Sequence, residues 1–201
     1  MIKRTFDLSA AVAGLLCLSP LFIVVAALIK MDSGGSVFFT QERVGRGFRS
    51  FRIYKFRTMV RDAPREGGPI TFGDDPRITK IGRVLRRTKI DELPQLINVL
   101  IGEMSVVGPR PEVRQYVDYF RHDYEQILTV RPGITDLASV KFRDEAAILG
   151  ALPNPEEMYL TSILPQKLRL GKEYVRGSSL ALDLTVIFKT LAALIGRRVS
   201  S

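Results

Sequence analysis

Two adjacent carboxylates, Asp91 and Glu92, are the strongest candidates for chemistry in this sequence, and Arg86, Arg87 and Lys89 directly precede them. Adjacent side chains on a helix point about 100° apart, so the two carboxylates can serve different roles at one centre. Ionised carboxylates beside arginine suit Mg²⁺ with a phosphate substrate, because Mg²⁺ takes one or two carboxylates and completes its shell with phosphate and water. The alternative is a charge pair that only stabilises the start of a helix.

The remaining composition narrows the chemistry further. Cys17 is the single cysteine and His122 the single histidine of the 201 residues. These counts exclude a disulfide framework and a zinc cage of His and Cys, and they disfavour a Ser-His or Cys-His catalytic pair. With 46% hydrophobic and 25% charged residues, the chain is typical of one folded domain and not of a disordered protein. Catalysis would therefore depend on Asp, Glu, Lys, Arg, Tyr or an oxygen-bound metal.

Positive charge gathers in the first half of the chain. The formal net charge is +9, and residues 1–90 alone carry +10, with 17 Lys and Arg against 7 Asp and Glu. Such a segment predicts an anionic partner, and the alternation of cations and aromatic residues over 48–57 is also typical of single-stranded nucleic-acid surfaces. On a strand, however, Arg52 lies on one face and Lys55 and Arg57 on the other. The pattern therefore favours a phosphate-bearing small molecule and no nucleic acid.

An uncharged apolar segment of 22 residues, Leu8 to Ile29, predicts insertion into a membrane. As a straight helix it would span about 33 Å, close to the thickness of a bilayer core. Pro20 near its middle removes one backbone hydrogen bond, and the Ser19 hydroxyl can bond to a freed carbonyl. Basic residues flank both ends, which keeps both flanks in the cytoplasm. We expect a re-entrant helix over residues 1–32 that breaks at Ser19 and Pro20; a kinked spanning helix is the alternative.

The elements that must position the carboxylates are short and mixed in type. Patterns of β-branched and aromatic residues predict two strands, 37–45 and 48–56, joined by a turn at Gly45 to Gly47. Residues 62–76 hold many glycines and prolines and predict a mobile loop. Helices are expected over 78–85, over 89–101 with Thr88 as its cap, and over 112–128, with proline-containing turns at 108–111 and 131–133.

The segment 180–195 is mostly apolar but contains Asp183 and Lys189. It is too short and too charged to span a bilayer, so it predicts a helix that lies in the membrane interface. A helix packed into the core is the alternative. Together these elements predict an α+β fold that is mostly helical.

Several motifs in this chain resemble one family over nearly its whole length. They are KRTFDLSAA with Ser19-Pro20, FTQERVG, YKFRTM, DDPRITKIGRVLRRTKIDELPQLINVLIGEMSVVGPRP and RPGIT. The long middle block is the most specific of them. The chain resembles the small monotopic phosphoglycosyl transferases, bacterial sugar transferases that begin glycan assembly on a polyprenyl-phosphate carrier.

The resemblance implies a reaction. A sugar-1-phosphate passes from a UDP-sugar to polyprenyl (undecaprenyl) phosphate and UMP is released, as the first membrane step of exopolysaccharide, O-antigen or glycoprotein assembly. In this family the aspartate of the Asp-Glu pair is the nucleophile and forms a covalent phosphosugar intermediate, which implies that role for Asp91. The glutamate helps to hold Mg²⁺, which assigns the metal to Glu92 together with Asp91. A carboxylate nucleophile divides the transfer into two steps.

The resemblance also implies binding residues. It assigns the substrate phosphates to Lys55, Arg57, Arg86 and Arg110, with Pro111 completing the Pro-Arg-Pro turn. The chain departs from the family after RPGIT, where Asp136-Leu137 replaces the frequent Gly-Trp. The next charged cluster, Arg143, Asp144 and Glu145, is a candidate part of the donor site, and a solvated charge cluster is the equal alternative.

The expected organisation has two parts, a re-entrant membrane helix (1–32) and a catalytic domain (33–201) that carries the interfacial helix 180–195. The domain would lie on the cytoplasmic face of the bacterial inner membrane and meet a UDP-sugar, polyprenyl phosphate and membrane lipid; its oligomeric state is open. Two other functions fit the same residues less well. One is a membrane-anchored, Mg²⁺-dependent phosphohydrolase, in which water accepts the phosphosugar, and the other is a non-enzymatic basic module tethered to the membrane.

Overall fold

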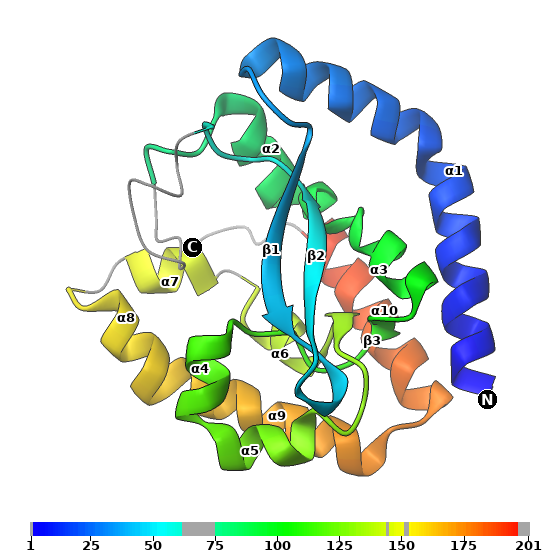
Figure 1. Ribbon diagram of the computed structural model, residues 1–201, viewed down its shortest axis with the longest axis vertical. Helices are drawn as coiled ribbons and strands as arrows, with labels where there is room; N and C mark the ends of the chain where they lie inside the picture. Colours follow the sequence, from blue (N-terminus) through cyan, green and yellow to red (C-terminus); the bar gives the residue numbers. More distant parts are fainter. Residues whose placement is uncertain (1, 62–74, 144, 151–152, 197–201) are drawn as a thin grey trace.

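The computed structural model describes residues 2–61, 75–143, 145–150 and 153–196. Helices dominate it, and a long two-stranded hairpin and a short parallel sheet complete the fold (Figure 1). The N-terminal helix runs along one side of the molecule, and most helices of the second half gather on the other (Figure 1). This arrangement confirms the predicted α+β, mostly helical class. Most of the loop predicted over residues 62–76 lies outside the described residues.

Helix α1 (Ile2–Asp32) is one continuous helix with Pro20 inside it. The Ser19 hydroxyl donates to the carbonyl oxygen of Leu16 at 2.8 Å, the group that Pro20 leaves without its helical partner. The predicted break at Ser19 and Pro20 is therefore wrong as an interruption: the helix bends near its middle and continues (Figure 1). The side chain restores a hydrogen bond that the backbone lost, so the helix need not end.

Most of the α1 surface is apolar and exposed. Only Asp7, Ala11, Val25 and Ile29 are buried. The large exposed side chains of the helix are Ile2, Val12, Leu16, Ile23, Val24, Leu28 and Met31. By length and composition α1 is also able to cross a bilayer. An apolar surface of this extent fits a monotopic membrane anchor, and the re-entrant course of the helix stays a prediction.

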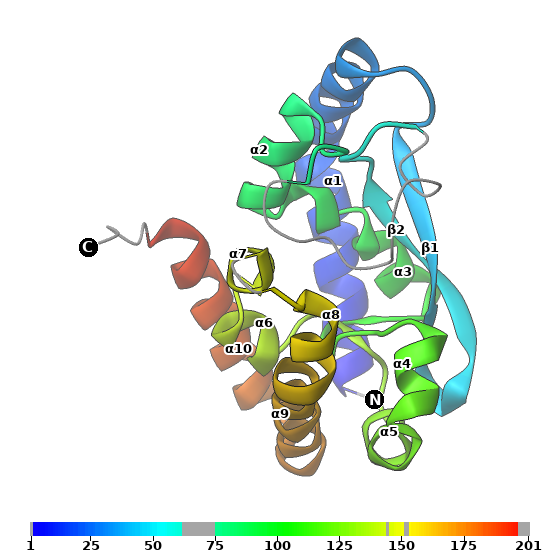
Figure 2. The same cartoon turned by 90° about the vertical axis from the view of Figure 1, so that its left-hand side faces the viewer.

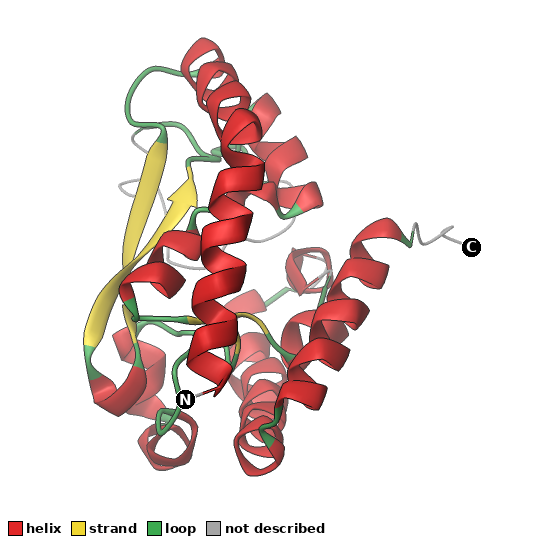
Figure 3. Cartoon of the chain, turned by 90° about the vertical axis from the view of Figure 1, so that its right-hand side faces the viewer, coloured by secondary structure: helices red, strands yellow, loops and turns green. Residues whose placement is uncertain are grey.

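Helix α1 runs along the outside of the molecule (Figure 3), and polar side chains near its start bind it to the rest of the chain. Asp7 is buried and accepts hydrogen bonds from the Ser105 hydroxyl at 2.9 Å and from the Val106 amide at 3.0 Å. Lys3 Nζ lies 2.6 Å from Asp183 Oδ2, on the last helix. If the start of α1 slid along its neighbours, buried Asp7 and Asp183 would lose these partners. An unpaired buried carboxylate is costly, so the position of the helix is fixed here.

Of the two sheets, the sequence pattern predicted one and not the other. Strands β1 (Phe38–Val44) and β2 (Ser50–Phe56) form the predicted antiparallel hairpin, in which Phe38 pairs with Phe56 and Val44 with Ser50. Its turn includes Gly47, whose φ of 64° favours glycine. Strands β3 (Ser105–Val107) and β4 (Gly133–Thr135) pair in parallel and were not predicted. Three residues are too few to show a period of two.

Two of the predicted helices are divided in the structure. Helix α2 (Lys80–Thr88) ends where 89–101 was expected to begin, and a short turn η3 (Ile90–Glu92) precedes α3 (Gln95–Ile101). Thr88 is therefore not an N-cap; its hydroxyl donates to the Val84 carbonyl inside α2 at 2.8 Å. The predicted helix 112–128 is divided into α4 (Arg114–Tyr119) and α5 (Arg121–Ile127) by non-helical angles at Phe120.

The second half of the chain is helical and supplies the largest core. It contains α6 (Leu137–Lys141), α7 (Glu145–Gly150), α8 (Pro155–Met158), the turn η4 (Tyr159–Ile163), α9 (Leu164–Gly177) and α10 (Leu180–Ile195). The core between α4, α5, η4 and α9 is formed by Tyr116, Val117, Tyr124, Ile127, Ile163, Leu164 and Leu168. Figure 2 shows α10 beside α6 and α9.

Helix α10 has the predicted bounds and two different faces. Asp183 and Val186 are fully buried, whereas Leu184, Phe188 and Leu191 are exposed. A helix packed into the core on all sides would hide these apolar side chains. The exposed face is what an interfacial helix needs, and that location remains a prediction.

Substitution of two helical glycines tests how tightly α2 is held. A Cβ at Gly82 would lie 2.0 Å from the carbonyl oxygen of Thr58, whereas a Cβ at Gly177 would meet nothing within 4 Å. We expect Gly82→Ala to lower the free energy of unfolding by about 3 kcal/mol, because a backbone atom must move. Gly177→Ala should be neutral or stabilising by about 0.5 kcal/mol. Thermal unfolding in detergent measures both; equal midpoints would show that α2 moves freely away from Thr58.

Candidate active site

A large open cleft with a volume of about 1930 Å³ runs between the hairpin and the helices of the second half. Its walls come from β1, β2, α2, η3, the turn before α4, α6, η4 and α10. The cleft brings together most of the site residues that the sequence predicted, namely Lys55, Arg57, Arg86, Asp91, Glu92, Arg110, Arg143 and Glu145. Pro111 is buried behind the wall, where it shapes the turn and does not face the cleft.

Asp91 is buried, and one of its two carboxylate oxygens has no hydrogen-bond partner among the described residues. Lys89 adopts a left-handed conformation, with φ of 59°, and this ends α2 and begins the turn that carries both carboxylates. Asp91 is 7% exposed, and its Oδ1 atom has no hydrogen-bond partner among the described residues. Burial, followed by the charge of Glu92, raises the pKa of Asp91. A buried carboxylate oxygen without a partner costs free energy, so this atom is positioned for a ligand.

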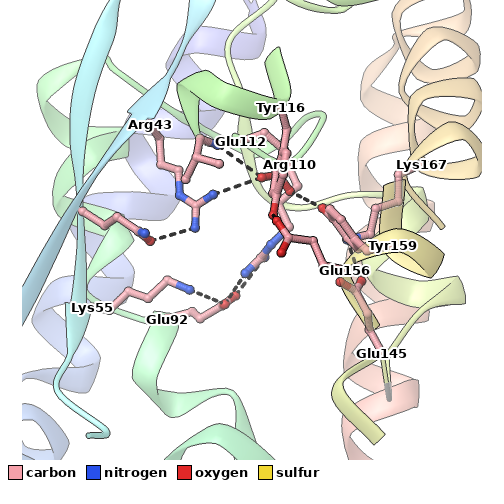
Figure 4. A network of polar contacts seen from close by, with 12 residues as sticks. Arg43, Lys55, Glu92, Arg110, Glu112, Tyr116, Glu145, Glu156, Tyr159 and Lys167 are labelled. Carbon is pink, nitrogen blue, oxygen red and sulfur yellow. Dashed lines mark hydrogen bonds and ion pairs between the residues drawn. The ribbon is translucent and has the colours of Figure 1, made fainter. Parts of the chain in front are cut away.

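Glu92, by contrast, has both carboxylate oxygens occupied (Figure 4). Lys55 Nζ lies 2.8 Å from Oε1, and the guanidinium of Arg110 contacts both oxygens, with Nη1 at 3.1 Å from Oε2. Burial alone would raise the pKa of Glu92, but the charges of Arg110 and Lys55 outweigh it and hold this pKa well below its usual range. The triad of Lys55, Glu92 and Arg110 therefore carries a net positive charge of one beside Asp91.

Contacts with residues 131–136 hold the backbone around Arg110. Gly108 and Gly133 pack so closely that neither position has room for a side chain. The Arg110 amide donates to Asp136 Oδ2 at 3.1 Å, and Asp136 Oδ1 caps α6 by accepting from the Ser139 amide at 2.6 Å. Asp136 departs from the family pattern, and no role was predicted for it from the sequence. Its signal was local, since aspartate before a short helical segment is a preferred N-cap.

Two other predicted phosphate ligands differ in what they contact. Arg86 donates from Nε to the Thr58 hydroxyl at 2.8 Å, and burial lowers its pKa while Asp91 and other acidic groups oppose the shift. Arg57 instead donates to the carbonyl oxygens of Ser33 and Gly34, at 2.7 and 2.5 Å. Its guanidinium thus holds the loop that follows α1, a structural role that the sequence did not predict. Arg86 keeps its predicted place near the carboxylates.

The candidate donor residues lie on the opposite wall of the cleft. Arg143 donates to the Gly196 carbonyl at 3.2 Å, and Glu145 pairs with Lys167. Asp144 lies outside the described residues. Arg143 and Glu145 therefore line the cleft, and each already has a partner within the protein. Their part in a donor site stays a prediction.

Glu112 is a partly buried acid that was predicted only as the first residue of a helix. It accepts from the Tyr159 hydroxyl at 2.6 Å and pairs with Arg43 at 3.1 Å (Figure 4). Burial alone would raise its pKa, but Arg43 and Lys167 outweigh this and lower it. Glu112 therefore joins β1 to η4 across the cleft, and no sequence motif indicated this link.

The two carboxylates fit Mg²⁺ only as part of a shell that other ligands complete. Within the described part of the chain, no group of three or more His, Cys, Asp or Glu residues is placed to hold a metal ion. Mg²⁺ needs fewer protein ligands when a substrate phosphate completes its shell, and the partnerless oxygen of Asp91 suits it. Glu92 would contribute only by sharing an oxygen that Lys55 or Arg110 now contacts.

This arrangement suits chemistry on phosphate esters. A buried carboxylate with one free oxygen faces a cleft lined by Lys55, Arg86 and Arg110. The carboxylate can act as a nucleophile, and the cations can offset the charge that repels two anions from each other. The same cleft has an apolar side, formed by Leu93, Leu96, Val106, Ile134, Ile187, Leu191 and Leu194.

Comparison with known proteins agrees with this chemistry. The chain is 40% identical to a UDP-N-acetylgalactosamine-undecaprenyl-phosphate N-acetylgalactosaminephosphotransferase of Aeromonas hydrophila, over 96% of this chain but only 44% of that protein. It is 36% identical to the exopolysaccharide production protein ExoY of Sinorhizobium fredii, over 95% of this chain and 84% of that protein. It is 37% identical to a UDP-glucose:undecaprenyl-phosphate glucose-1-phosphate transferase of Caulobacter vibrioides, over 96% of this chain and 69% of that protein. Residues 1–197 match the bacterial sugar transferase family, and the chain belongs to that family.

Proposed function

We propose that this protein transfers a sugar-1-phosphate from a UDP-sugar to undecaprenyl phosphate or a similar polyprenyl phosphate, with release of UMP. The observation that carries the proposal is the partnerless Oδ1 of buried Asp91 beside the positively charged triad of Lys55, Glu92 and Arg110. The names of the relatives, which act on UDP-sugars and undecaprenyl phosphate, support it. The exposed apolar surfaces of α1 and α10 suit a lipid substrate.

In the proposed first step, an Asp91 oxygen attacks the phosphorus that carries the sugar. A bond forms between that oxygen and phosphorus, and the bond to the bridging oxygen breaks, so UMP leaves. In the second step an oxygen of the lipid phosphate attacks the same phosphorus, and the carboxylate of Asp91 leaves. Lys55 and Arg110 offset the charge of the phosphates in both steps, and Glu92 keeps the two cations in place.

Magnesium belongs to the same proposal. Asp91 and Glu92 would hold the ion, which when bound supplies further neutralisation of the diphosphate. The work of orienting the phosphates remains with Lys55, Arg86 and Arg110, which line the cleft on the protein side.

The two other functions are less consistent with the cleft. A phosphohydrolase needs water as the acceptor, but one side of the cleft is apolar and continues to the exposed faces of α10. A binding module tethered to the membrane would gain nothing from a buried carboxylate oxygen without a partner.

The proposed setting is the cytoplasmic face of the inner membrane, with both ends of α1 in the cytoplasm. The bend at Pro20 and the basic residues on both flanks support this course, and so does the chemistry, because UDP-sugars are cytoplasmic. The active-site cleft would then lie at the membrane surface that the lipid phosphate reaches.

Substitution of the carboxylates tests the covalent step. Asp91→Asn should lower turnover by about 10³-fold or more, because an amide cannot form the acyl-phosphate intermediate. Glu92→Gln should also be severely impaired, through weaker metal binding and loss of the ion pairs. UMP release from a panel of UDP-sugars measures both, with Asp118→Asn, an exposed carboxylate on α4, as the control. Mass spectrometry without acceptor should find the phosphosugar on Asp91; an adduct elsewhere, or an active Asp91→Asn, contradicts the mechanism.

A double-mutant cycle tests whether Asp136 positions Arg110. Serine is a good N-cap, so Asp136→Ser should keep the cap of α6 but lose the hydrogen bond to the Arg110 amide. We expect kcat/KM to fall about tenfold in Asp136→Ser and more in Arg110→Ala, with little further change when the two are combined. Arg121→Ala, on an exposed helical face, is the control. Fully additive losses would show that Asp136 does not act through Arg110.

Cysteine labelling tests the course of α1. Ile2 is 74% exposed, and a side chain at Gly34 would meet nothing within 4 Å, so Ile2→Cys and Gly34→Cys can be made in a Cys17→Ala background. An impermeant thiol reagent should label neither position in intact cells and both after permeabilisation. Labelling of Ile2→Cys alone in intact cells would show a spanning helix.

A further inference from the structure

A row of cations on α2 remains without acidic partners. Lys80, Arg83 and Arg87 lie on one face of the helix, because their spacing of three and four residues brings side chains into line. All three are exposed, and in the described part of the chain none of them forms an ion pair. Arg169 on α9, by contrast, is exposed and pairs with Glu173. Aligned like charges repel each other, so the row is best satisfied by an external anion.

The position of this row relative to the membrane helix is well defined. Leu85 and Ile81, on the inner face of α2, pack against Val25 and Ile29 of α1. The Ile81 amide also donates to Asp32 Oδ2 at the end of α1, at 3.1 Å. Figures 1 and 3 show α2 beside the second half of α1. The cations therefore lie next to the part of α1 whose exposed residues, apart from Lys30, are apolar.

The row also reaches the active-site cleft. Arg83, Val84 and Arg87 line the same cleft as Asp91, and Arg86 and Lys89 continue the basic wall toward it. The close approach of Gly82 to the Thr58 carbonyl fixes the rotation of α2, so these side chains cannot turn away. A basic path thus leads from the edge of the membrane helix to the candidate nucleophile.

We propose that Arg83 and Arg87 bind the phosphate head group of the lipid acceptor, a polyprenyl phosphate, and guide it from the membrane to Asp91. The inference rests on the proposed function and adds a site for one of its two substrates. Phospholipid head groups also carry phosphate, but a phosphodiester has one negative charge. A phosphomonoester has close to two at neutral pH, which matches a pair of arginines.

The test compares two double variants that each remove two charges. Arg83→Gln with Arg87→Gln removes the pair on α2, and Arg169→Gln with Arg176→Gln removes two exposed arginines on α9 that do not line the cleft. In micelles of a neutral detergent, we expect the α2 variant to raise the KM for polyprenyl phosphate about tenfold. The KM for the UDP-sugar and the stoichiometric release of UMP without acceptor should stay within twofold of the wild type. The α9 variant should leave all three unchanged.

Each other result overturns the inference. A raised KM for the UDP-sugar, or a smaller release of UMP without acceptor, would assign the row to the donor. An unchanged KM for polyprenyl phosphate, with weaker sedimentation on phosphatidylglycerol vesicles, would assign it to bulk lipid.

A second measurement does not depend on activity. Polyprenyl phosphate should raise the unfolding temperature of the wild type in neutral micelles and that of the α2 variant much less. An equal rise in both proteins would also refute the inference. If this difference is found while no UDP-sugar releases UMP, the proposed transferase function fails and the lipid-phosphate site stands.

Discussion

The ion-pair triad of Lys55, Glu92 and Arg110 is the interaction on which the rest of the site depends. Its members come from β2, from η3 and from the turn before α4, three segments that only the fold brings together (Figure 4). All three side chains are partly buried, so removing one member would leave a partly desolvated charge without compensation, which destabilises the site. The relative position of these three segments is therefore constrained. Because Asp91 precedes Glu92 in the same turn, its position is constrained as well.

Each member of the triad is backed by a different part of the molecule. Lys55 lies on a hairpin strand whose partner, β1, is linked to η4 through Arg43 and Glu112. Arg110 is held by Asp136, which also caps α6. These links explain how a segment as short as η3 keeps a fixed geometry in the wall of a wide and open cleft. Rigidity comes from buried polar contacts more than from long regular elements.

The cleft lies where two kinds of surface meet. Its polar side holds the carboxylates and cations, and its apolar side continues to α10, whose outer face is exposed and apolar. The proposed transfer of a sugar-1-phosphate from a soluble sugar nucleotide to a membrane lipid would need both surfaces within reach of Asp91. Lys3 pairs with Asp183, and Asp7 accepts hydrogen bonds from β3. These contacts fix the position of the apolar helix α1 relative to the cleft. The proposed membrane anchor and the candidate site are thus held together by buried polar contacts.

Local pattern was enough to predict the hairpin, the bounds of α10, the length of the apolar helix and the Asp91-Glu92 pair, because each depends on near neighbours in the chain. The Ser19 contact with Leu16 was of the same kind, although it bends the helix where a break was predicted. The tertiary structure alone decided the rest: Arg57 holds a loop more than 20 residues away, Glu92 is saturated by partners from two other segments, and β3 pairs with β4. These depend on which groups meet in space, where burial makes an unpaired charge or amide too costly to leave, and no periodicity along the chain records such meetings.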